Sequence, residues 1–195
     1  MNLPNKLTIS RIILSPIFMI IFLLEAPTAK LVGLIIFAVA ALTDLGDGYL
    51  ARRLGRTTGF GKFMDPLADK VLTSTAFIVL VAAGHVRAWM VALIIAREFV
   101  ITGFRLLAAY RGIVIAATFF AKTKTFLQML SISVILLYIY LEAAWPEVLA
   151  GWGLQRSPEV TRTIDGLVLL TTIITVGTGV DYVMKYAGLM KNVLK

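Results

Sequence analysis

Four aspartates lie close together in the first third of the chain, and their spacing suits metal binding. Asp44 and Asp47 are three residues apart, and Asp65 and Asp69 are four apart, so each pair shares one face of a helix. Because the connection between the pairs is short, we expect antiparallel neighbouring helices with all four carboxylates at one end. Carboxylates are preferred ligands of Mg²⁺ and Mn²⁺, and bridging carboxylates hold two such ions about 3.5–4 Å apart. The spacing therefore predicts a site for two divalent cations, and such a pair of ions suits phosphoryl chemistry.

A structural role is the alternative for these aspartates. Some of them would then be protonated or paired with nearby cations. An ionised aspartate beside hydrocarbon costs about 2.5–3.5 kcal/mol on insertion scales, and four together also repel one another. Pairing explains one such aspartate well and four poorly. The nearby cations are Arg52, Arg53, Lys62 and Lys70.

Small residues continue the acidic face of the first of these helices. Gly48 is four residues after Asp44, and Ala51 is four residues after Asp47. Without bulk at these positions, an extended ligand can approach the helix backbone closely. The alternative is that both residues only permit tight helix packing, which is common in membranes. Arg52 lies one turn beyond Gly48, where it can bind a phosphate.

The composition is typical of a membrane protein. Of the 195 residues, 59% are hydrophobic and 15% are charged, against roughly 45–50% and about 25% in an ordinary soluble domain. This composition excludes a disordered chain, a collagen and a soluble nucleic-acid binder, so the net charge of +8 indicates anionic lipid as the partner. The chain has no cysteine and one histidine, His85. Disulfides, thiolate metal sites and a cysteine nucleophile are therefore excluded, and any metal must be bound by oxygen ligands.

Apolar runs that are long enough to cross a bilayer as helices, about 20 residues each, recur along the chain. We expect an all-α bundle of six transmembrane helices, which forms a single membrane domain over residues 1–195 with an amphipathic interfacial segment at 1–10. A signal peptide is the alternative for the first run, but five further runs follow it. Residues 145–162 are expected to form a surface loop. The expected spans are 9–24, 31–52, 63–84, 88–110, 123–144 and 163–187.

The basic residues predict how this bundle is oriented. Fourteen Lys and Arg residues flank the spans on the side that carries both termini, four lie on the other side, and Arg97 lies within a span. Because cytoplasmic loops are enriched in Lys and Arg, we expect both termini and the four aspartates at the cytoplasmic side. His85 and Arg87 are expected at the opposite side, without a catalytic role.

Cations in the later spans predict a second site, for an anionic molecule. Arg97 and Arg105 are eight residues apart, just over two helical turns, and so face nearly the same way. An arginine inside a span is a functional candidate, although pairing with Glu98 or another acid is the alternative for Arg97. With Lys122 and Lys124 there are four cations opposite four aspartates. This balance favours a substrate that carries its own phosphate.

The segment from Asp44 to Asp69 also resembles a family signature. It reads D-x2-D-G-x2-A-R-x8-G-x3-D-x3-D and matches every fixed position of the signature of the CDP-alcohol phosphatidyltransferases. Residues 2–11, 97–105 and 121–125 resemble the bacterial phosphatidylglycerophosphate synthases within that family. One departure is Gly46, where the family is expected to have a bulkier residue such as Trp or Phe.

The resemblance implies a six-helix, homodimeric enzyme of the bacterial cytoplasmic membrane, which joins CDP-diacylglycerol to an alcohol and releases CMP. It implies that Asp44, Asp47 and Asp65 bind two Mg²⁺ or Mn²⁺ ions, and that Asp69 is both a ligand and the general base. Together with the four cations, it favours sn-glycerol 3-phosphate as the acceptor. The implied nucleotide and diphosphate residues are Gly48, Ala51, Arg52, Gly61, Asn5 and Thr8, and the candidates for the acceptor phosphate are Arg97, Arg105, Lys122 and Lys124.

Two other functions are compatible with these residues. The nearer one is the same chemistry with another acceptor, either phosphatidylglycerol, which gives cardiolipin, or inositol phosphate. The more distant one is a small ion-coupled transporter, because acids and arginines inside a membrane also mark transport pathways. Against transport, the acids lie at one mouth of the bundle instead of along a path across it, and no inverted repeat is recognisable.

Overall fold

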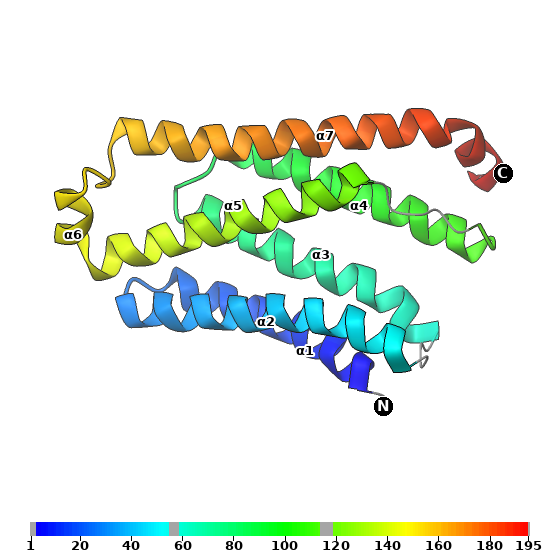
Figure 1. The fold of residues 1–195 in the computed structure, drawn as a ribbon, viewed down its shortest axis with the longest axis horizontal. Helices are drawn as coiled ribbons and strands as arrows, with labels where there is room; N and C mark the ends of the chain where they lie inside the picture. The colour runs from blue at the N-terminus through cyan, green and yellow to red at the C-terminus, as the bar shows by residue number, and fades with distance from the viewer. Residues whose placement is uncertain (1–2, 55–58, 114–118, 195) are drawn as a thin grey trace.

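The computed structural model of the chain is an elongated bundle of helices (Figure 1). The structure describes residues 3–54, 59–113 and 119–194. Within these ranges, the side chains of residues 3–7, 44–54, 59–63, 65, 66, 119–122 and 187–194 lie outside the description. The helices of the described part are α1 (Leu3–Leu23), α2 (Pro27–Leu54), α3 (Gly59–Ala82), α4 (Ala88–Tyr110), α5 (Phe119–Ala144), α6 (Pro146–Gly151) and α7 (Pro158–Leu194).

The long helices run roughly along the long axis of the bundle, and α6 lies at one end (Figure 1). The start of α1 and the end of α7 both lie at the other end, where α2 ends and α3 begins (Figure 1). This arrangement brings the aspartate-bearing parts of α2 and α3 to the end of the bundle that carries the termini.

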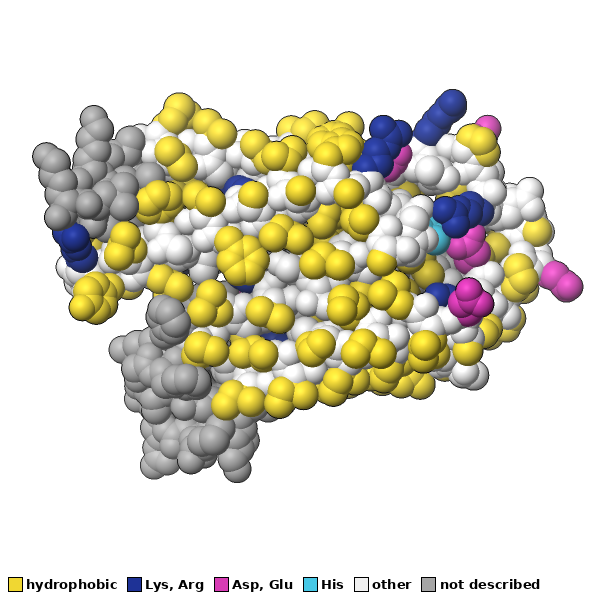
Figure 2. Space-filling view, turned by 180° about the vertical axis from the view of Figure 1, so that it is seen from behind, with side chains coloured by type: hydrophobic (Ala, Val, Ile, Leu, Met, Phe, Trp, Pro, Cys, Tyr) yellow, Lys and Arg dark blue, Asp and Glu magenta, His cyan; other side chains and the backbone are white. Residues whose placement is uncertain are grey.

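The helices are apolar enough for lipid. Among the described residues, Thr123–Ala144 of α5 and Pro158–Tyr186 of α7 are long and apolar enough to cross a membrane. Large hydrophobic side chains, such as Ile20, Leu42 and Ile173, are exposed. Figure 2 shows hydrophobic side chains along the length of one face, while most of the visible charged side chains gather at the end with α6. Such a surface is unfavourable in water and suited to lipid. These are the features of a membrane protein.

The described part of the chain is helical, as the sequence predicted, and each of the six predicted spans overlaps one of the long helices. The number of membrane crossings stays a prediction. One detail of the prediction was wrong. The region expected to be a loop contains α6, which begins with Pro146 and has Glu147 in its first turn; both residues favour a helix start. Residues 3–10 belong to α1, which is continuous from Leu3 to Leu23, and their place at the membrane interface stays a prediction.

Helix α7 begins five residues before the predicted span. Ser157 accounts for this start, because its Oγ accepts a hydrogen bond from the main-chain N–H of Val160 at 3.2 Å. Such a bond satisfies one of the N–H groups that a helix leaves without a partner at its beginning. Pro158 follows in the first turn, where its fixed φ angle fits a helix and its missing N–H costs nothing.

The core of the bundle lies between α1, α2, α3, α4, α5 and α7. Helix α1 packs on α2 and α3, α5 packs on α2, α3 and α7, and α4 packs on α3 and α7. Phe18 lies at the centre of an aromatic group, with ring centroids 5.7 Å from Phe22 and 5.5 Å from Phe37. The other large buried side chains of the core include Phe77, Leu80, Ile94, Ile132, Ile135, Leu136 and Val168.

Helices α1 and α2 approach each other closely at Gly33. A Cβ atom at this position would lie 2.9 Å from Cβ and 3.1 Å from Cα of Phe22. Lys30 strengthens the same contact, because its ammonium lies 5.4 Å from the ring centroid of Phe22 and 3.4 Å from its carbonyl oxygen. The absence of a side chain at Gly33 therefore allows the α1–α2 hairpin to close.

We expect Gly33→Ala to destabilise the protein by about 1–3 kcal/mol, because the backbone of Phe22 must move to accept the methyl group. The measurement is thermal unfolding of the purified protein in detergent. Gly166→Ala on α7 is the matched control, since an added Cβ there meets no atom of the described structure within 4 Å. The control should be neutral or slightly stabilising, as alanine is the better helix former. Equal unfolding temperatures for the two variants would contradict the role of Gly33.

Candidate active site

Both aspartate pairs lie on the helices predicted for them. Asp44 and Asp47 are in the second half of α2, and Asp65 and Asp69 are in the first half of α3. Helices α2 and α3 are in contact. The convergence of the four carboxylates stays a prediction, because most of the side chains concerned lie outside the described residues. These are Asp44, Asp47 and Asp65, together with Gly48, Ala51, Arg52, Gly61 and Asn5.

Asp69 is the member of this group whose side chain is described. Its side chain is 30% exposed, and its Oδ2 atom lies 2.8 Å from Nζ of Lys70. The main-chain carbonyl of Asp69 accepts a hydrogen bond from the hydroxyl of Thr73, one turn further along α3, at 3.1 Å. The carboxylate is thus accessible to a metal ion or a substrate, while the ion pair with Lys70 restricts its rotation.

Lys70 connects Asp69 to a second acid, Glu98 of α4. Its Nζ atom lies 3.0 Å from Oε2 of Glu98, and the two side chains are only 13% and 5% exposed. One ammonium group therefore bridges a partly exposed carboxylate and a buried one. A bridge of this kind links the orientation of Asp69 to the position of α4.

The other oxygen of Glu98 is held by three further side chains. Oε1 accepts hydrogen bonds from Nζ of Lys124, from Nη1 of Arg97 at 3.2 Å and from Nε2 of Gln128 at 3.3 Å. Burial of an unpaired charge costs several kcal/mol, so a carboxylate in this position requires such partners. The residues Glu98, Lys70, Arg97, Lys124 and Gln128 are referred to below as the Glu98 cluster.

The Glu98 cluster joins α3, α4 and α5, and two of its members extend it to α7. Nε2 of Gln128 donates to Oγ1 of Thr175 at 3.2 Å, and Nη2 of Arg97 donates to Oγ1 of Thr178 at 3.1 Å. Counted together with Asp69, these side chains comprise three cations and two carboxylates. Within this set of described side chains, the cations outnumber the carboxylates by one.

Arg97 reaches α7 across a glycine. A Cβ atom at Gly179 would lie 2.8 Å from Cγ and 3.1 Å from Nε of Arg97. The aliphatic part of the arginine therefore lies directly against the backbone of α7. This close approach positions the guanidinium between Glu98 and Thr178.

The candidate residues for the acceptor phosphate differ in their surroundings. Arg97 is paired with Glu98, which is the alternative that the sequence left open for it. Lys124 is buried and also bound to Glu98. Arg105 is exposed on α4, whereas the side chain of Lys122 lies outside the described residues. Thr8, a candidate for the nucleotide, is buried in α1. The binding roles of these residues stay predictions.

Lys70 and Glu98 were expected only as possible partners, of the aspartates and of Arg97 respectively. The bridge from Asp69 through Lys70 to Glu98, and the central position of Glu98, were not predicted. One signal was present, since Glu98 is the only acidic residue between Asp69 and Glu142. An acid is almost never fully buried without a partner, so an isolated acid in an apolar region indicates a buried ion pair. Its partners lie on other helices, with Lys124 26 residues further along the chain. Spacing along one helix cannot identify such partners.

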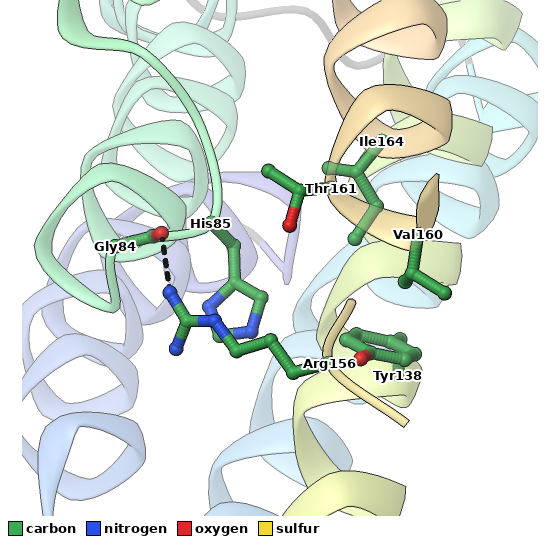
Figure 3. A pocket seen from close by; sticks show the side chains of 7 residues that line it. All are labelled: Gly84, His85, Tyr138, Arg156, Val160, Thr161 and Ile164. Atoms are coloured by element: carbon green, nitrogen blue, oxygen red, sulfur yellow. Dashed lines mark hydrogen bonds between the residues drawn. The ribbon is translucent and has the colours of Figure 1, made fainter. Parts of the chain in front are cut away.

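A second polar group lies at the end of the bundle that carries α6. Nε2 of His85 lies 3.0 Å from Oε2 of Glu142, and Nη2 of Arg156 donates to the carbonyl of Gly84 at 3.0 Å. Figure 3 shows His85, Arg156 and Tyr138 around a small pocket there, between the α3–α4 connection and the start of α7. Arg87 is paired with Asp165 at 2.9 Å. These contacts connect helices at the end opposite to the one where the aspartate-bearing ends of α2 and α3 meet.

Comparison with known proteins identifies the family. The family model described as CDP-alcohol phosphatidyltransferase matches residues 1–178. A Bacillus subtilis (strain 168) protein named CDP-diacylglycerol–glycerol-3-phosphate 3-phosphatidyltransferase is 50% identical over 149 residues, which cover 70% of this chain and 77% of the relative. Proteins of the same name from Rickettsia bellii and Salmonella typhimurium are 41% and 40% identical; the matches cover 70% and 68% of this chain and 75% of each relative.

The match therefore extends through all of the helices that carry Asp69 and the Glu98 cluster, and includes the stretch from Asp44 to Asp69 whose signature the sequence analysis identified. The chain belongs to the CDP-alcohol phosphatidyltransferase family.

Proposed function

We propose that the protein transfers the phosphatidyl group of CDP-diacylglycerol to sn-glycerol 3-phosphate, which yields phosphatidylglycerophosphate and CMP. The observation that carries this proposal is the 50% identity to a Bacillus subtilis protein whose name states the donor and the acceptor. Two features of the chain support it. The aspartates of α2 and α3 have the spacing of a metal site, and the Glu98 cluster adds positive charge beside Asp69.

The donor set fits hard divalent cations. Four carboxylates, from Asp44, Asp47, Asp65 and Asp69, offer only oxygen ligands, which suit Mg²⁺ or Mn²⁺. The partly exposed carboxylate of Asp69 is consistent with such a role. When bound, two such cations would neutralise negative charge on the diphosphate. The rest of the site would bind the nucleotide through Gly48, Ala51, Arg52, Gly61, Asn5 and Thr8.

Asp69 is proposed to be the general base. Its carboxylate takes the proton of the acceptor hydroxyl as the hydroxyl oxygen attacks the phosphorus that bears the diacylglycerol. The bond from this phosphorus to the oxygen shared with CMP then breaks, and CMP leaves with the bonding electrons. Phosphoryl transfer requires little covalent participation by the protein, so positioning and electrostatics supply most of the acceleration. The restraint of Asp69 by Lys70 is therefore relevant to the rate.

The acceptor phosphate is proposed to bind the cations of α4 and α5. Arg105 is the candidate with an exposed side chain among the described residues. Lys122 is a further candidate from the sequence alone. Arg97 and Lys124 contribute positive charge from within the Glu98 cluster. A phosphate-bearing acceptor fits these four cations better than serine, choline or ethanolamine.

We further propose that the protein is a homodimer in the bacterial cytoplasmic membrane, crosses it six times and has both termini and the active site on the cytoplasmic side. The distribution of Lys and Arg supports this orientation. The start of α1 and the end of α7 lie at the same end of the bundle, which is consistent with this orientation (Figure 1).

Asp69→Asn tests the general base. We expect CMP release to fall about 10²–10⁴-fold, because the amide cannot accept the proton, while CDP-diacylglycerol still binds. The measurements are steady-state kinetics and ligand binding on the purified enzyme in detergent. Asp165→Asn, the same change at the end with α6, is the control and should keep full activity. Substantial turnover by Asp69→Asn would remove Asp69 from the role of base.

Removal of divalent ions tests the metal site. Treatment of the purified enzyme with EDTA should abolish CMP release, and Mg²⁺ or Mn²⁺ should restore it, because four unneutralised carboxylates would repel a diphosphate. Titration of the metal-free enzyme with Mn²⁺, without substrate, should show that more than one Mn²⁺ ion binds per chain. Full activity after chelation would show that the aspartates do not serve a metal.

Arg105→Gln tests the acceptor site. We expect the KM for glycerol 3-phosphate to rise about tenfold or more, because a hydrogen bond to a charged group is lost, with little change in the KM for CDP-diacylglycerol. Arg87→Gln, at the end with α6, is the matched control. Labelled glycerol 3-phosphate, inositol phosphate and phosphatidylglycerol should be compared as acceptors. Product formation with only one of the other two would overturn the proposed acceptor.

A further inference from the structure

The ion pair between Asp69 and Lys70 joins two neighbours on one helix. Successive side chains on an α-helix point in directions about 100° apart and do not face each other. The pair is nevertheless close, with Nζ of Lys70 2.8 Å from Oδ2 of Asp69. Helix geometry alone does not maintain such a contact. A further group must direct the lysine, whose four-carbon stem is flexible.

Glu98 provides this direction from α4. Its Oε2 atom binds the same ammonium at 3.0 Å, so Lys70 is held between two carboxylates. Glu98 itself has little freedom, because Lys124, Arg97 and Gln128 hold its other oxygen, Oε1. The two oxygens of Glu98 thus have separate functions. Oε1 fixes the carboxylate to α4 and α5, and Oε2 binds the lysine that contacts Asp69.

We propose that Glu98 is a positioning residue for the reaction: it anchors Lys70, and the anchored Lys70 holds the Asp69 carboxylate through Oδ2 in one orientation. This inference rests on the proposed role of Asp69. Joining helices does not by itself explain the contact of Glu98 with Lys70. Lys124 and Gln128 already join α5 to Glu98 on α4 through the Oε1 atom.

A double-mutant cycle separates positioning from a general packing role. The variants are Glu98→Gln, Lys70→Met and the double variant, with kcat and KM measured on purified enzyme. If Glu98 acts through Lys70, each single change should lower kcat about tenfold with the KM for CDP-diacylglycerol nearly unchanged, and the double variant should be no worse than the poorer single variant. Multiplied losses, of about a hundredfold in the double variant, would overturn the proposal.

Changes at Lys70 alone cover the case that Glu98→Gln fails to fold. Lys70→Arg keeps a cation that can reach both carboxylates and should recover most of the kcat that Lys70→Met loses. Full kcat in Lys70→Met would overturn the proposal by itself. Glu142→Gln, which removes the partner of His85 at the end with α6, is the matched control for loss of a glutamate charge and should keep wild-type kcat.

Mn²⁺ binding without substrate, measured by electron paramagnetic resonance, gives a readout that does not depend on turnover. Glu98→Gln should raise the Mn²⁺ concentration at half saturation, because the released Lys70 then competes fully for Asp69. The increase should be at least about threefold smaller in the Lys70→Met background. The direct effect of the lost charge is present in both backgrounds and cancels in this comparison. An equal increase in both backgrounds would contradict positioning through Lys70.

The experiments distinguish an error in the proposed function from an error in the positioning role of Glu98. If the wild-type enzyme does not release CMP with glycerol 3-phosphate, the proposed function is wrong, and the Mn²⁺ comparison still tests the link from Glu98 to Asp69. If the wild-type enzyme is active and Asp69→Asn is not, but the kinetic and Mn²⁺ effects of Glu98 and Lys70 are independent, the proposed function stands and the positioning role is wrong.

Discussion

The carboxylate of Glu98 is buried in an apolar bundle, and much of the surrounding structure follows from the need to compensate it. Lys70, Arg97 and Lys124 converge on it from three helices. Loss of one partner from a buried pair typically costs about 3–5 kcal/mol, whereas replacement of a whole buried cluster by apolar residues is often neutral. Stability alone therefore does not explain why so many charges meet in this position. Lys70 connects these buried charges to Asp69, so the free energy spent on burying them is linked to the candidate active site.

The two ends of the bundle contrast in their polar contacts. At the end with α6, charged groups are used in contacts between segments, such as His85 with Glu142 and Arg87 with Asp165. Towards the other end, Asp69 keeps part of its carboxylate exposed, and its partner Lys70 is shared with a buried acid. Polar contacts thus join helices in both parts of the bundle, and the part with Asp69 also presents a restrained, partly exposed carboxylate beside a buried one. This arrangement fits a membrane enzyme whose polar substrates arrive from one side.

Much of the fold could be predicted from the sequence, because long apolar runs have few alternatives to a helix in a membrane. The helix starts were less accurate, since they depend on local capping, as Ser157 and Pro158 show for α7. The spacing of the aspartates and the family motif predict a metal site, which stays a prediction because three of the four carboxylates lie outside the described residues. The role of Glu98 could not be predicted in the same way, because its partners approach from separate helices and tertiary packing alone brings them together.

The contact of Arg97 with Gly179 has a consequence for the placement of α7. Hydrogen bonds depend on direction, so they restrict the rotation and axial position of a helix more strictly than apolar contacts do. A guanidinium that lies against bare backbone and donates to Thr178 favours one rotation and one axial register of α7. The arginine that was singled out as a substrate ligand thereby also helps, beside Gln128 and Arg87, to set the last helix against the rest of the protein.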